Sequence, residues 1–342
     1  MELRDYQREV FDLIDNNTEY AFQLPCGTGK NVIISEYINR HPEYKYVVFS
    51  PSIYLANEMC RLINRPVNRI FSDKPTEEVH DISICVYNSW KKLQNDYDIL
   101  FIDEAHHFEN GAWEMEECVI PRKYFFSATL EIPNYKYDHS KAVKNNYIVN
   151  FNMNIHNVVD EESMLNVVKV LQNNPNYKHV IAYCNEKVLA VMLTIILKDH
   201  GIAAECVHSG MYRKDINRNI NDFKESKIRV LVNCYLINEG VDIKICDCAL
   251  FYNNRRSEVQ IVQCIGRMQR LFPEKTIGNF ICFLGESAKS ISCIKKYLKV
   301  IFINSKYFEN DNKITIKLIN ERDDQEETKG FKTIRKIIEK IN

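Results

Sequence analysis

The chain has 342 residues, of which 45% are hydrophobic and 27% charged, the composition of a soluble globular protein long enough for two domains. A formal net charge of −1 gives no general attraction to polyanions, so any contact with nucleic acid must come from a local basic stripe. No apolar run approaches the roughly 20 residues that span a bilayer, and residues 1–7 lack the features of a signal peptide. We therefore expect no membrane partner and a cytoplasmic location.

Short apolar runs alternate with amphipathic stretches along the chain, a rhythm that predicts βα units around a parallel sheet. In the first half, strands are predicted at residues 20–24, 46–50, 82–86, 97–102 and 123–126. Residues 133–160 lack clear periodicity, and we interpret them as the crossing between two lobes. The rhythm then restarts, with strands predicted at 179–183, 229–233, 249–252 and 279–283. Beyond about residue 286 we expect a helix, a short strand pair around 314–316, an acidic patch and a final amphipathic helix.

The 12 cysteines are scattered singly, mostly inside apolar runs. The closest pair, Cys246 and Cys248, has no second pair at zinc spacing, so reduced core thiols are a better interpretation than metal ligands. Cys26 differs from the rest because it lies in a glycine-rich loop, where its thiol could be chemically accessible.

That glycine-rich loop follows the first predicted strand and reads Leu24-Pro25-Cys26-Gly27-Thr28-Gly29-Lys30. Glycines let backbone amides point inward at a helix amino terminus, so the loop is suited to cradle nucleotide phosphates, with Lys30 adding a positive charge. The standard phosphate loop begins with Gly and has Ser or Thr after the lysine, whereas this chain has Leu24 and Asn31. The missing hydroxyl ordinarily ligates Mg²⁺, and the Asn31 amide oxygen either replaces it or leaves metal binding weak. A purely structural glycine turn is the alternative.

Asp103 and Glu104 stand where the fourth predicted strand stops. The carboxyl ends of parallel strands meet at one edge of a sheet, which would hold both carboxylates facing the phosphates. Asp103 suits Mg²⁺, and Glu104 suits orienting and deprotonating an attacking water. Zinc binding by His106 and His107 is the alternative, but no partner ligands lie at helical spacing.

An arginine pair, Arg267 and Arg270, lies in the segment 263–270. On a helix their spacing puts both guanidinium groups on one face, where they would stabilise charge on a transferring γ-phosphoryl group. A solvated basic helix face is the alternative.

Six motifs in this order resemble those of the superfamily 2 helicases and translocases: residues 4–7 (Arg-Asp-Tyr-Gln), 24–30, 103–106 (Asp-Glu-Ala-His), 127–129 (Ser-Ala-Thr), 238–242 (Asn-Glu-Gly-Val-Asp) and 263–270. With residues 208–210 and 255–257, the chain looks most like the branch holding the helicase subunits of restriction enzymes and related DEAH helicases of viruses, phages and bacteria. The resemblance implies an α/β fold of two tandem RecA-like domains, each a mostly parallel sheet flanked by helices. It places an ATP-binding domain at 1–135, an inter-lobe connection at 136–160, a helicase C-terminal domain at 161–285 and an extension packed on or near the second lobe at 286–342.

The resemblance also implies a set of functional residues. Arg4 and Gln7 would read adenine, and Gln263 would contact the γ-phosphate or the attacking water. The nucleotide contacts would be Arg4, Gln7, Cys26, Gly27, Thr28, Gly29, Lys30, Asn31, Gly240 and Asp242. The metal ligands would be Asp103 and Asn31, the catalytic residues Glu104, Gln263, Arg267 and Arg270, and the coupling residues His106, Ser127 and Thr129. Nucleic-acid contacts would be Ser50, Pro51, Ser52, Asn88, Ser89, Tyr183, Asn185 and Asn233, for each of which a turn or cap role is an equal alternative.

Together these features predict an enzyme that uses ATP and Mg²⁺ to move along or remodel nucleic acid, in the cytoplasm or in the viral or host compartment where nucleic acid is processed. DNA is favoured over RNA. The alternatives are a slow ATP-gated clamp or sensor, which Asn31 motivates, an RNA helicase, and the motor subunit of a larger complex.

Overall fold

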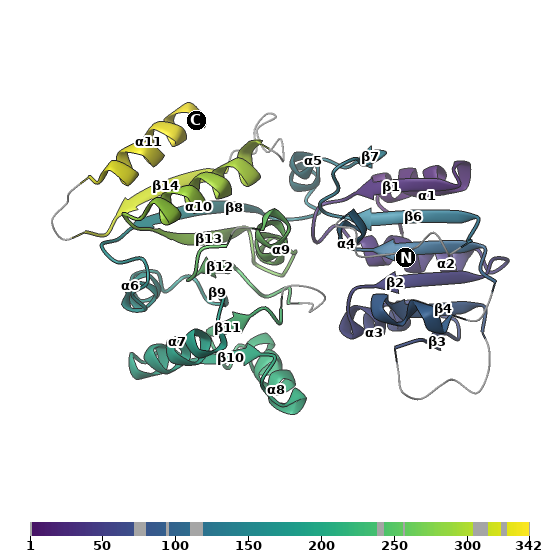
Figure 1. The fold of residues 1–342 in the computed structure, drawn as a ribbon, viewed down its shortest axis with the longest axis horizontal. Helices are drawn as coiled ribbons and strands as arrows, with labels where there is room; N and C mark the ends of the chain where they lie inside the picture. The colour runs from purple at the N-terminus through teal and green to yellow at the C-terminus, as the bar shows by residue number, and fades with distance from the viewer. Residues whose placement is uncertain are drawn as a thin grey trace. The chain divides into compact units, whose positions relative to one another are not determined.

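The computed structural model describes residues 2–71, 80–93, 96–109, 119–237, 243–255, 257–303, 314–322 and 327–341. The chain forms two compact units, the first ending at Asp138 and the second beginning at His139. Each unit is built on its own seven-stranded sheet, which can be followed by colour in Figure 1.

The first unit has a sheet in the order β3-β4-β2-β5-β6-β1-β7, with parallel pairing throughout its described strands. Its strands are β1 (Glu19–Gln23), β2 (Tyr46–Ser50), β3 (Asn68–Arg69), β4 (Ile82–Val86), β5 (Ile99–Asp103), β6 (Arg122–Ser127) and β7 (Tyr135–Lys136). Its helices are α1 (Asp5–Asn16), α2 (Lys30–Arg40), α3 (Ile53–Leu62), the 3₁₀ helix η1 (Tyr87–Lys92) and α4 (His106–Glu109).

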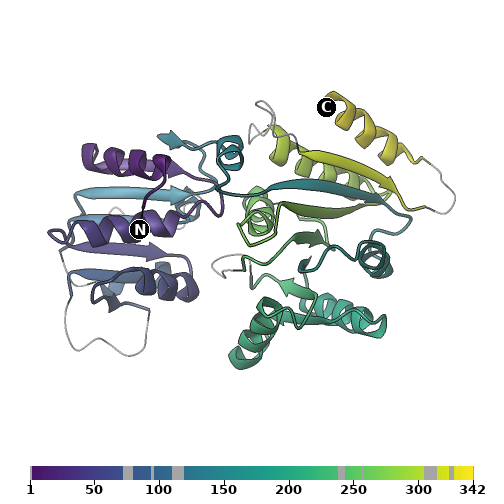
Figure 2. The ribbon, with the colours of Figure 1, turned by 180° about the vertical axis from the view of Figure 1, so that it is seen from behind.

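Every residue of β2 and β5 is buried, so both faces of the sheet are covered at its centre, as in other parallel sheets. On the face covered by α1, α2 and α3, Phe101 of β5 packs edge-on against Tyr37 of α2 with ring centroids 5.8 Å apart (Figure 2). Leu100 points to the opposite face and joins Tyr87 and Tyr97 in a second cluster. Alternate residues of a central strand such as β5 therefore pack into separate parts of the core, one on each face of the sheet.

Because the strands are parallel, the segments that follow them share one edge of the sheet. Along this edge lie residues 24–30 after β1, 127–129 at the end of β6, 103–104 at the end of β5, 50–52 at the end of β2 and 88–89 after β4. This edge carries most of the motifs singled out in the first half of the sequence.

The second unit repeats the parallel architecture in the order β10-β11-β9-β12-β13-β8-β14. Its strands are β8 (Asn150–Asn157), β9 (Val180–Cys184), β10 (Ala204–His208), β11 (Val230–Cys234), β12 (Cys248–Phe251), β13 (Ile277–Leu284) and β14 (Thr315–Asn320). Its helices are α5 (His139–Lys144), α6 (Leu165–Asn173), α7 (Lys187–Asp199), α8 (Arg213–Lys224), α9 (Glu258–Met268), α10 (Ala288–Leu298) with a π-helical turn at Lys299–Ile303, and α11 (Lys329–Ile341).

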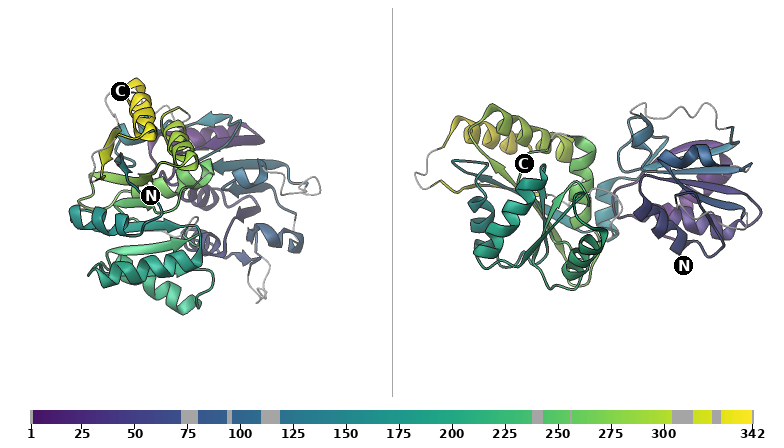
Figure 3. Two further views of the ribbon diagram at one scale, coloured as in Figure 1. Left: turned by 60° about the vertical axis from the view of Figure 1, so that its left-hand side comes forward. Right: turned by 60° about the horizontal axis from the view of Figure 1, so that its bottom comes forward.

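Helices cover both faces of this sheet (Figure 3). On one face α6 and α7 share a cluster with the central strands, to which Leu171 and Leu193 contribute. On the other face three aromatic rings pack edge to face, with Phe251 of β12 lying 4.8 Å from Phe280 of β13 and 5.5 Å from Tyr297 of α10 between ring centroids. The predicted α/β class with two parallel sheets is confirmed, and the nine predicted strands lie within two residues of observed ones.

Two expectations about the sheet need correction. The sequence predicts an irregular connection over 133–160, yet residues 150–157 within it form β8, an inner strand between β13 and β14. Its apolar residues Phe151, Met153 and Ile155 do alternate, but the intervening asparagines and histidine are mostly buried too, which disguised the strand as a polar segment. Of the strand pair expected around 314–316, the described residues contain β14, which pairs with β8, a strand distant in sequence.

Side-chain contacts fasten β14 to β8. His156 Nδ1 lies 2.8 Å from Glu321 Oε1, and Asn157 Nδ2 donates to Asn320 Oδ1 at 2.8 Å. The hydrogen bond from His156 lowers the pKa of the Glu321 carboxyl below its usual value. The tail beyond residue 313 is thus an integral edge of the second sheet.

Candidate functional site

The glycine loop passes from the end of β1 into α2 through two residues with left-handed backbone. Gly27 has φ of 81° and Gly29, which caps α2, has φ of 90°. Side chains other than glycine rarely adopt this conformation, and a Cβ on Gly29 would also lie 3.2 Å from Gln7 Nε2. The left-handed backbone therefore favours glycine at Gly29, the residue that caps the start of α2.

Residues of the amino-terminal motif form hydrogen bonds with the glycine loop. The hydroxyl of Tyr6 donates to the carbonyl of Thr28, and Gln7 Nε2 donates to the same carbonyl at 3.4 Å. Gln7 Oε1 accepts from the Arg4 amide at 3.0 Å, and the Gln7 amide donates to the Arg4 carbonyl at 3.0 Å, so the two residues fix the start of α1. The Thr28 hydroxyl donates to the Pro25 carbonyl at 2.7 Å, so it is engaged within the loop.

A lysine and two carboxylates meet at the mouth of this loop. Lys30 Nζ lies 3.7 Å from Glu104 Oε1, and both side chains are largely buried. Asp103 is buried at the end of β5, where burial and the neighbouring Glu104 carboxylate raise its pKa well above the usual value, against the opposing effect of Lys30. Glu104 has φ of 52°, and its amide donates to Asp103 Oδ1 at 3.0 Å. The strained backbone turns the Glu104 carboxylate toward Lys30 instead of continuing the strand.

A polar chain joins these carboxylates to the neighbouring strand. His106 Nδ1 lies 3.5 Å from Glu104 Oε2 and 2.9 Å from Ser127 Oγ at the end of β6. Ser127 Oγ in turn accepts from the Thr129 amide at 3.1 Å. The ends of β5 and β6 are connected side chain to side chain, so a change at Glu104 can be transmitted to the turn after β6.

The residues present suit a divalent cation held jointly with a phosphate ligand. No group of three or more His, Cys, Asp or Glu side chains that could hold a metal by itself occurs among the described residues. Mg²⁺ in phosphate-handling sites is ordinarily bound by one or two carboxylates and the substrate phosphates, which Asp103 could provide. Glu104 Oε2 is buried without a hydrogen-bond partner, as expected of a group that awaits a ligand. Asn31, which lies in the first turn of α2, is partly exposed.

The residues predicted to contact nucleic acid in the first unit lie at the same sheet edge but differ in their exposure to solvent and in their hydrogen bonds. Ser50 is buried at the end of β2, and Ser52 caps α3 by accepting from the Leu55 amide at 3.3 Å. Asn88 and Ser89 lie in η1, with Asn88 exposed. The cap accounts for a serine at position 52 without any ligand.

The nucleic-acid candidates of the second unit are largely engaged within the protein. Tyr183 is fully buried on β9. Asn233, also fully buried, accepts the amides of Leu236 and Ile237 on its Oδ1 at 3.0 and 2.9 Å. The backbone amide of Asn185 donates to Asn253 Oδ1 at 3.0 Å, and its side-chain Nδ2 donates to the Asn254 carbonyl at 3.3 Å. These side chains tie together the loops at the carboxyl edge of the second sheet.

The arginine segment forms the end of α9. Gln263 and Arg267 are buried, and Arg270 lies just beyond the helix, which ends at Met268. Sequence reasoning missed the intervening Gln269, whose Nε2 donates to His139 Nε2 at 2.6 Å and to the Val149 carbonyl at 3.2 Å. Burial lowers the pKa of His139 to about 3. The expected residues Gly240 and Asp242 lie outside the described residues.

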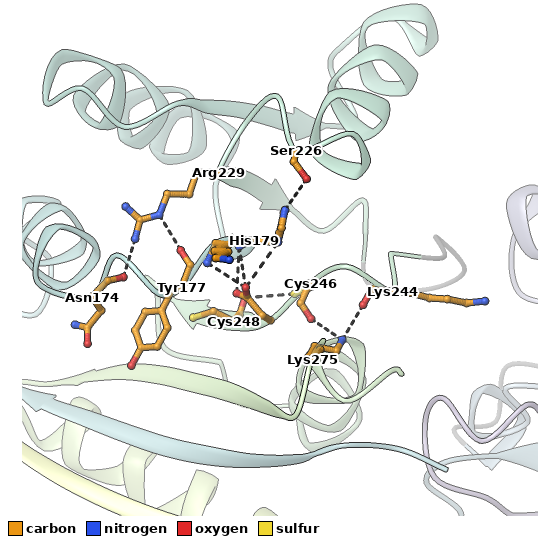
Figure 4. A network of polar contacts seen from close by, with 11 residues as sticks. Asn174, Tyr177, His179, Ser226, Arg229, Lys244, Cys246, Cys248 and Lys275 are labelled. Carbon is orange, nitrogen blue, oxygen red and sulfur yellow. Dashed lines mark hydrogen bonds and ion pairs between the residues drawn. The ribbon is translucent and has the colours of Figure 1, made fainter. Parts of the chain in front are cut away.

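The amino-terminal edge of the second sheet holds a polar network of its own (Figure 4). The Asp247 carboxylate accepts from the amides of Lys178 and His179, and the His179 ring bonds Ser226 at 2.9 Å. Lys275 Nζ donates to the carbonyls of Lys244 and Cys246, while burial lowers its pKa to about 8. The network lies away from the motif-bearing edge and joins the loops that enter the strands.

Comparison with known proteins places this geometry in a family. Residues 1–132 match the family model described as Type III restriction enzyme, res subunit, and residues 162–272 match that described as Helicase conserved C-terminal domain. These two matches, one in each unit, agree with the superfamily 2 helicases and, for the first unit, with the restriction-enzyme type. The resemblance drawn from the motifs is thereby confirmed.

Individual relatives agree with the family models. The chain is 23% identical over 84% of its length to IRC3 of Saccharomyces cerevisiae, named as an ATP-dependent helicase, and it covers 52% of that protein. Its fold is similar to that of S. cerevisiae Dbp5 bound to RNA and ADP BeF3, with a TM-score of 0.70 and 17% identity over 98% of this chain and 93% of that one. It is equally similar to the Type ISP restriction-modification enzyme LlaBIII bound to DNA, with a TM-score of 0.72 and 15% identity over 100% of this chain and 33% of that one.

These likenesses make the two units tandem RecA-like domains. The chain spans about half the length of the curated relatives it matches. None of the helices in the described part of the chain is long and apolar enough to cross a membrane.

Proposed function

We propose that this chain is a nucleic-acid-stimulated ATP hydrolase that moves along or remodels nucleic acid, with DNA favoured as the substrate. The cluster of Lys30, Asp103 and Glu104 at the mouth of a glycine loop carries the proposal, because it combines a phosphate cradle, a metal carboxylate and a base. The restriction-enzyme-type family supports DNA, while relatives named as RNA helicases leave RNA as the alternative.

In this proposal the first unit binds the nucleotide. The backbone amides around Gly27 and Gly29 donate to the phosphate oxygens, and Lys30 turns from Glu104 to the β- and γ-phosphates. Bound Mg²⁺, held by Asp103 and assisted by Asn31, would neutralise phosphate charge. Glu104, released from Lys30, orients the attacking water and takes its proton. The remaining nucleotide contacts are Arg4, Gln7, Cys26 and Thr28, with Gln7 acting near the loop that it braces.

Coupling and completion of the site involve further residues. His106, Ser127 and Thr129 would report the state of Glu104 to the end of β6, a role supported by their continuous hydrogen bonds. Gln263, Arg267 and Arg270 of the second unit would stabilise charge on the γ-phosphoryl group, with Gly240 and Asp242 as additional nucleotide contacts.

For the nucleic acid, we propose contacts to its backbone by residues at the carboxyl edges of both sheets. Ser50, Pro51, Ser52, Asn88 and Ser89 would serve in the first unit and Asn185 in the second. Tyr183 and Asn233, being buried, would position the loops that make these contacts rather than touch the strand themselves. Such contacts do not depend on base sequence.

We further propose that residues 1–135 act as the ATP-binding domain and 161–285 as the helicase C-terminal domain. Residues 136–160 connect them and contribute β8, and residues 286–342 serve as an extension of the second domain.

The deciding experiment measures ATP hydrolysis by the purified chain with Mg²⁺, alone and with single-stranded or duplex DNA and RNA. The proposal expects stimulation by at least one nucleic acid, greatest with DNA. Turnover no higher than background with all four would show that the chain is not a motor.

A second candidate, a slow ATP-gated clamp, is favoured by Asn31 in place of a metal-binding hydroxyl. Asn31→Thr distinguishes the two because it restores that hydroxyl at the start of α2. A large gain in ATPase rate would favour the clamp, whereas no change or a loss would show that the amide suffices. Motor activity within a larger complex is tested by copurification from the native host.

A further inference from the structure

Tyr235, which follows β11 in the second unit, has a backbone conformation that bulky residues avoid. Its φ is 59°, in the left-handed region. The turn around it is held by Asn233, whose Oδ1 accepts the amides of Leu236 and Ile237. Strain of this kind persists only where the surroundings enforce it, and it concentrates at functional sites.

The ring of Tyr235 packs on a buried cation while the residue stays open to solvent. Arg255 Cζ lies 5.0 Å from the Tyr235 ring centroid, 5.1 Å from that of Tyr183 and 5.7 Å from that of Phe251. Arg255 is 2% exposed, and Tyr183 and Phe251 are equally buried, whereas Tyr235 is 48% exposed. Tyr235 is therefore the solvent-facing member of an aromatic group that encloses a guanidinium.

The guanidinium of Arg255 is paired with no carboxylate among the residues that the structure describes. Its two hydrogen bonds go to neutral acceptors, the Cys184 carbonyl and Gln260 Oε1, both at 3.4 Å. Its Nε is buried without a partner, and Arg255 takes part in none of the ion pairs found among the described residues. A buried cation without compensation is unfavourable, so an anionic ligand nearby would be stabilised by it. The guanidinium itself is enclosed, so a ligand would contact the exposed Tyr235 ring and lie close to the positive charge behind it.

We propose that Tyr235 is a stacking platform for a base of single-stranded nucleic acid, with Arg255 behind the ring favouring the polyanionic strand. This inference rests on the proposed function, since it supposes that the chain binds nucleic acid. Every base presents a π-face, so stacking on an aromatic ring tolerates any sequence and strengthens binding by about 5- to 150-fold per base. Tyr235 follows β11 at the same sheet edge as Asn185, which follows β9.

Two substitutions distinguish a role of the Tyr235 ring in binding from a role in the stability of the fold. Tyr235→Asn removes the ring but suits a left-handed backbone, so its melting temperature should equal or exceed that of the wild type. Tyr235→Phe keeps the ring and should bind as the wild type does. In fluorescence anisotropy with single-stranded DNA and, separately, RNA, we expect Tyr235→Asn to bind about 5- to 150-fold more weakly.

An oligonucleotide of the same length with abasic sites supplies the decisive arm. It keeps the phosphates and removes the bases, so the wild type and Tyr235→Asn should bind it alike. Equal binding of both proteins to the intact strand, or an equal loss on the intact and abasic strands, would overturn the stacking role. Absence of any nucleic-acid binding by the wild type would instead refute the proposed function, and comparison of the DNA and RNA arms identifies the strand preferred.

Discussion

The two units share one sheet topology but use its edges differently. In each sheet the first strand in sequence, β1 or β8, lies next to the last strand in the order, and corresponding strands occupy corresponding places. At the carboxyl edge of the first sheet, Lys30 faces Glu104 beside a buried Asp103. At the same edge of the second sheet, amide side chains such as Asn233 tie loops together, and the charged network lies at the opposite edge (Figure 4). Both sheets therefore have a carboxyl edge at which a ligand can bind. The residues at the strand ends differ, and in the first unit they form the cluster of Lys30, Asp103 and Glu104.

Among substitutions that test this difference between the two units, we expect the largest effect from Glu104→Gln. The amide cannot accept a proton, so kcat for ATP hydrolysis should fall by about 10² to 10⁴, while nucleotide affinity is retained. Steady-state turnover with saturating nucleic acid and equilibrium binding of a nucleotide analogue measure the two quantities. Glu205→Gln, on β10 of the second unit, is the matched control and should leave kcat unchanged. Retention of most of the activity by Glu104→Gln would place the catalytic base elsewhere.

Two lysines, the buried Lys30 and the partly buried Lys275, test the comparison directly. Lys30→Met should lower kcat/KM for ATP by about 10² to 10³, because it removes a cation that faces the phosphates. Lys275→Met removes hydrogen bonds to the Lys244 and Cys246 carbonyls in the second unit, so it should lower the melting temperature and leave kcat of the folded protein intact. Paired ATPase and thermal-denaturation measurements check both variants. If both lysines affected turnover alike, the division of labour between the edges would be wrong.

A smaller effect is expected for Asn233→Ala. The variant leaves the buried amides of Leu236 and Ile237 without their acceptor, which should cost about 1 to 3 kcal/mol of unfolding free energy. Asn221→Ala, on the exposed side of α8, should change it by less than about 0.5 kcal/mol. Denaturant titration gives both values. A stable Asn233→Ala with weakened nucleic-acid binding would restore Asn233 as a direct contact.

The smallest effect concerns pH and His139. Its folded pKa of about 3 lies below the roughly 6.5 of an unfolded histidine, so the unfolded chain binds the extra proton first as pH falls. The group therefore stabilises the fold fully above about pH 6.5 and progressively less down to about pH 3, losing about 1 kcal/mol between pH 7 and 5.5. His139→Asn should remove this part of the pH dependence in unfolding curves. The same slope in the variant would mean that other groups account for it.

Much of the fold could be predicted because the central strands are continuous apolar runs, as in Tyr46–Ser50 and Ile99–Asp103. Their parallel order also implied that Lys30 and Glu104 would approach, and the structure brings them to 3.7 Å. The strand Asn150–Asn157 was not predicted because more than half of its residues are polar, and three of them, Asn154, His156 and Asn157, are nevertheless buried.

The details that sequence could not supply depend on which way a side chain turns. Tyr183 and Asn233 stand at strand ends like the other nucleic-acid candidates, but packing directs both inward. The contact between Gln269 and His139 joins residues 130 positions apart, and no sequence pattern links the segment 263–270 to His139. Such pairings arise from tertiary packing, which local patterns do not encode.

The place of β8 in the second sheet has a consequence for the order in which the chain can fold. All strands of the first sheet lie within residues 19–136, so that unit can assemble as soon as its own segment has left the ribosome. β8 is made early, yet its neighbours are β13 and β14, at residues 277–284 and 315–320. During synthesis it would wait with both edges open, and unpaired strand edges invite association with other chains. The second unit is therefore the part of a nascent chain most in need of protection, and the last strand to arrive covers an edge exposed since the beginning.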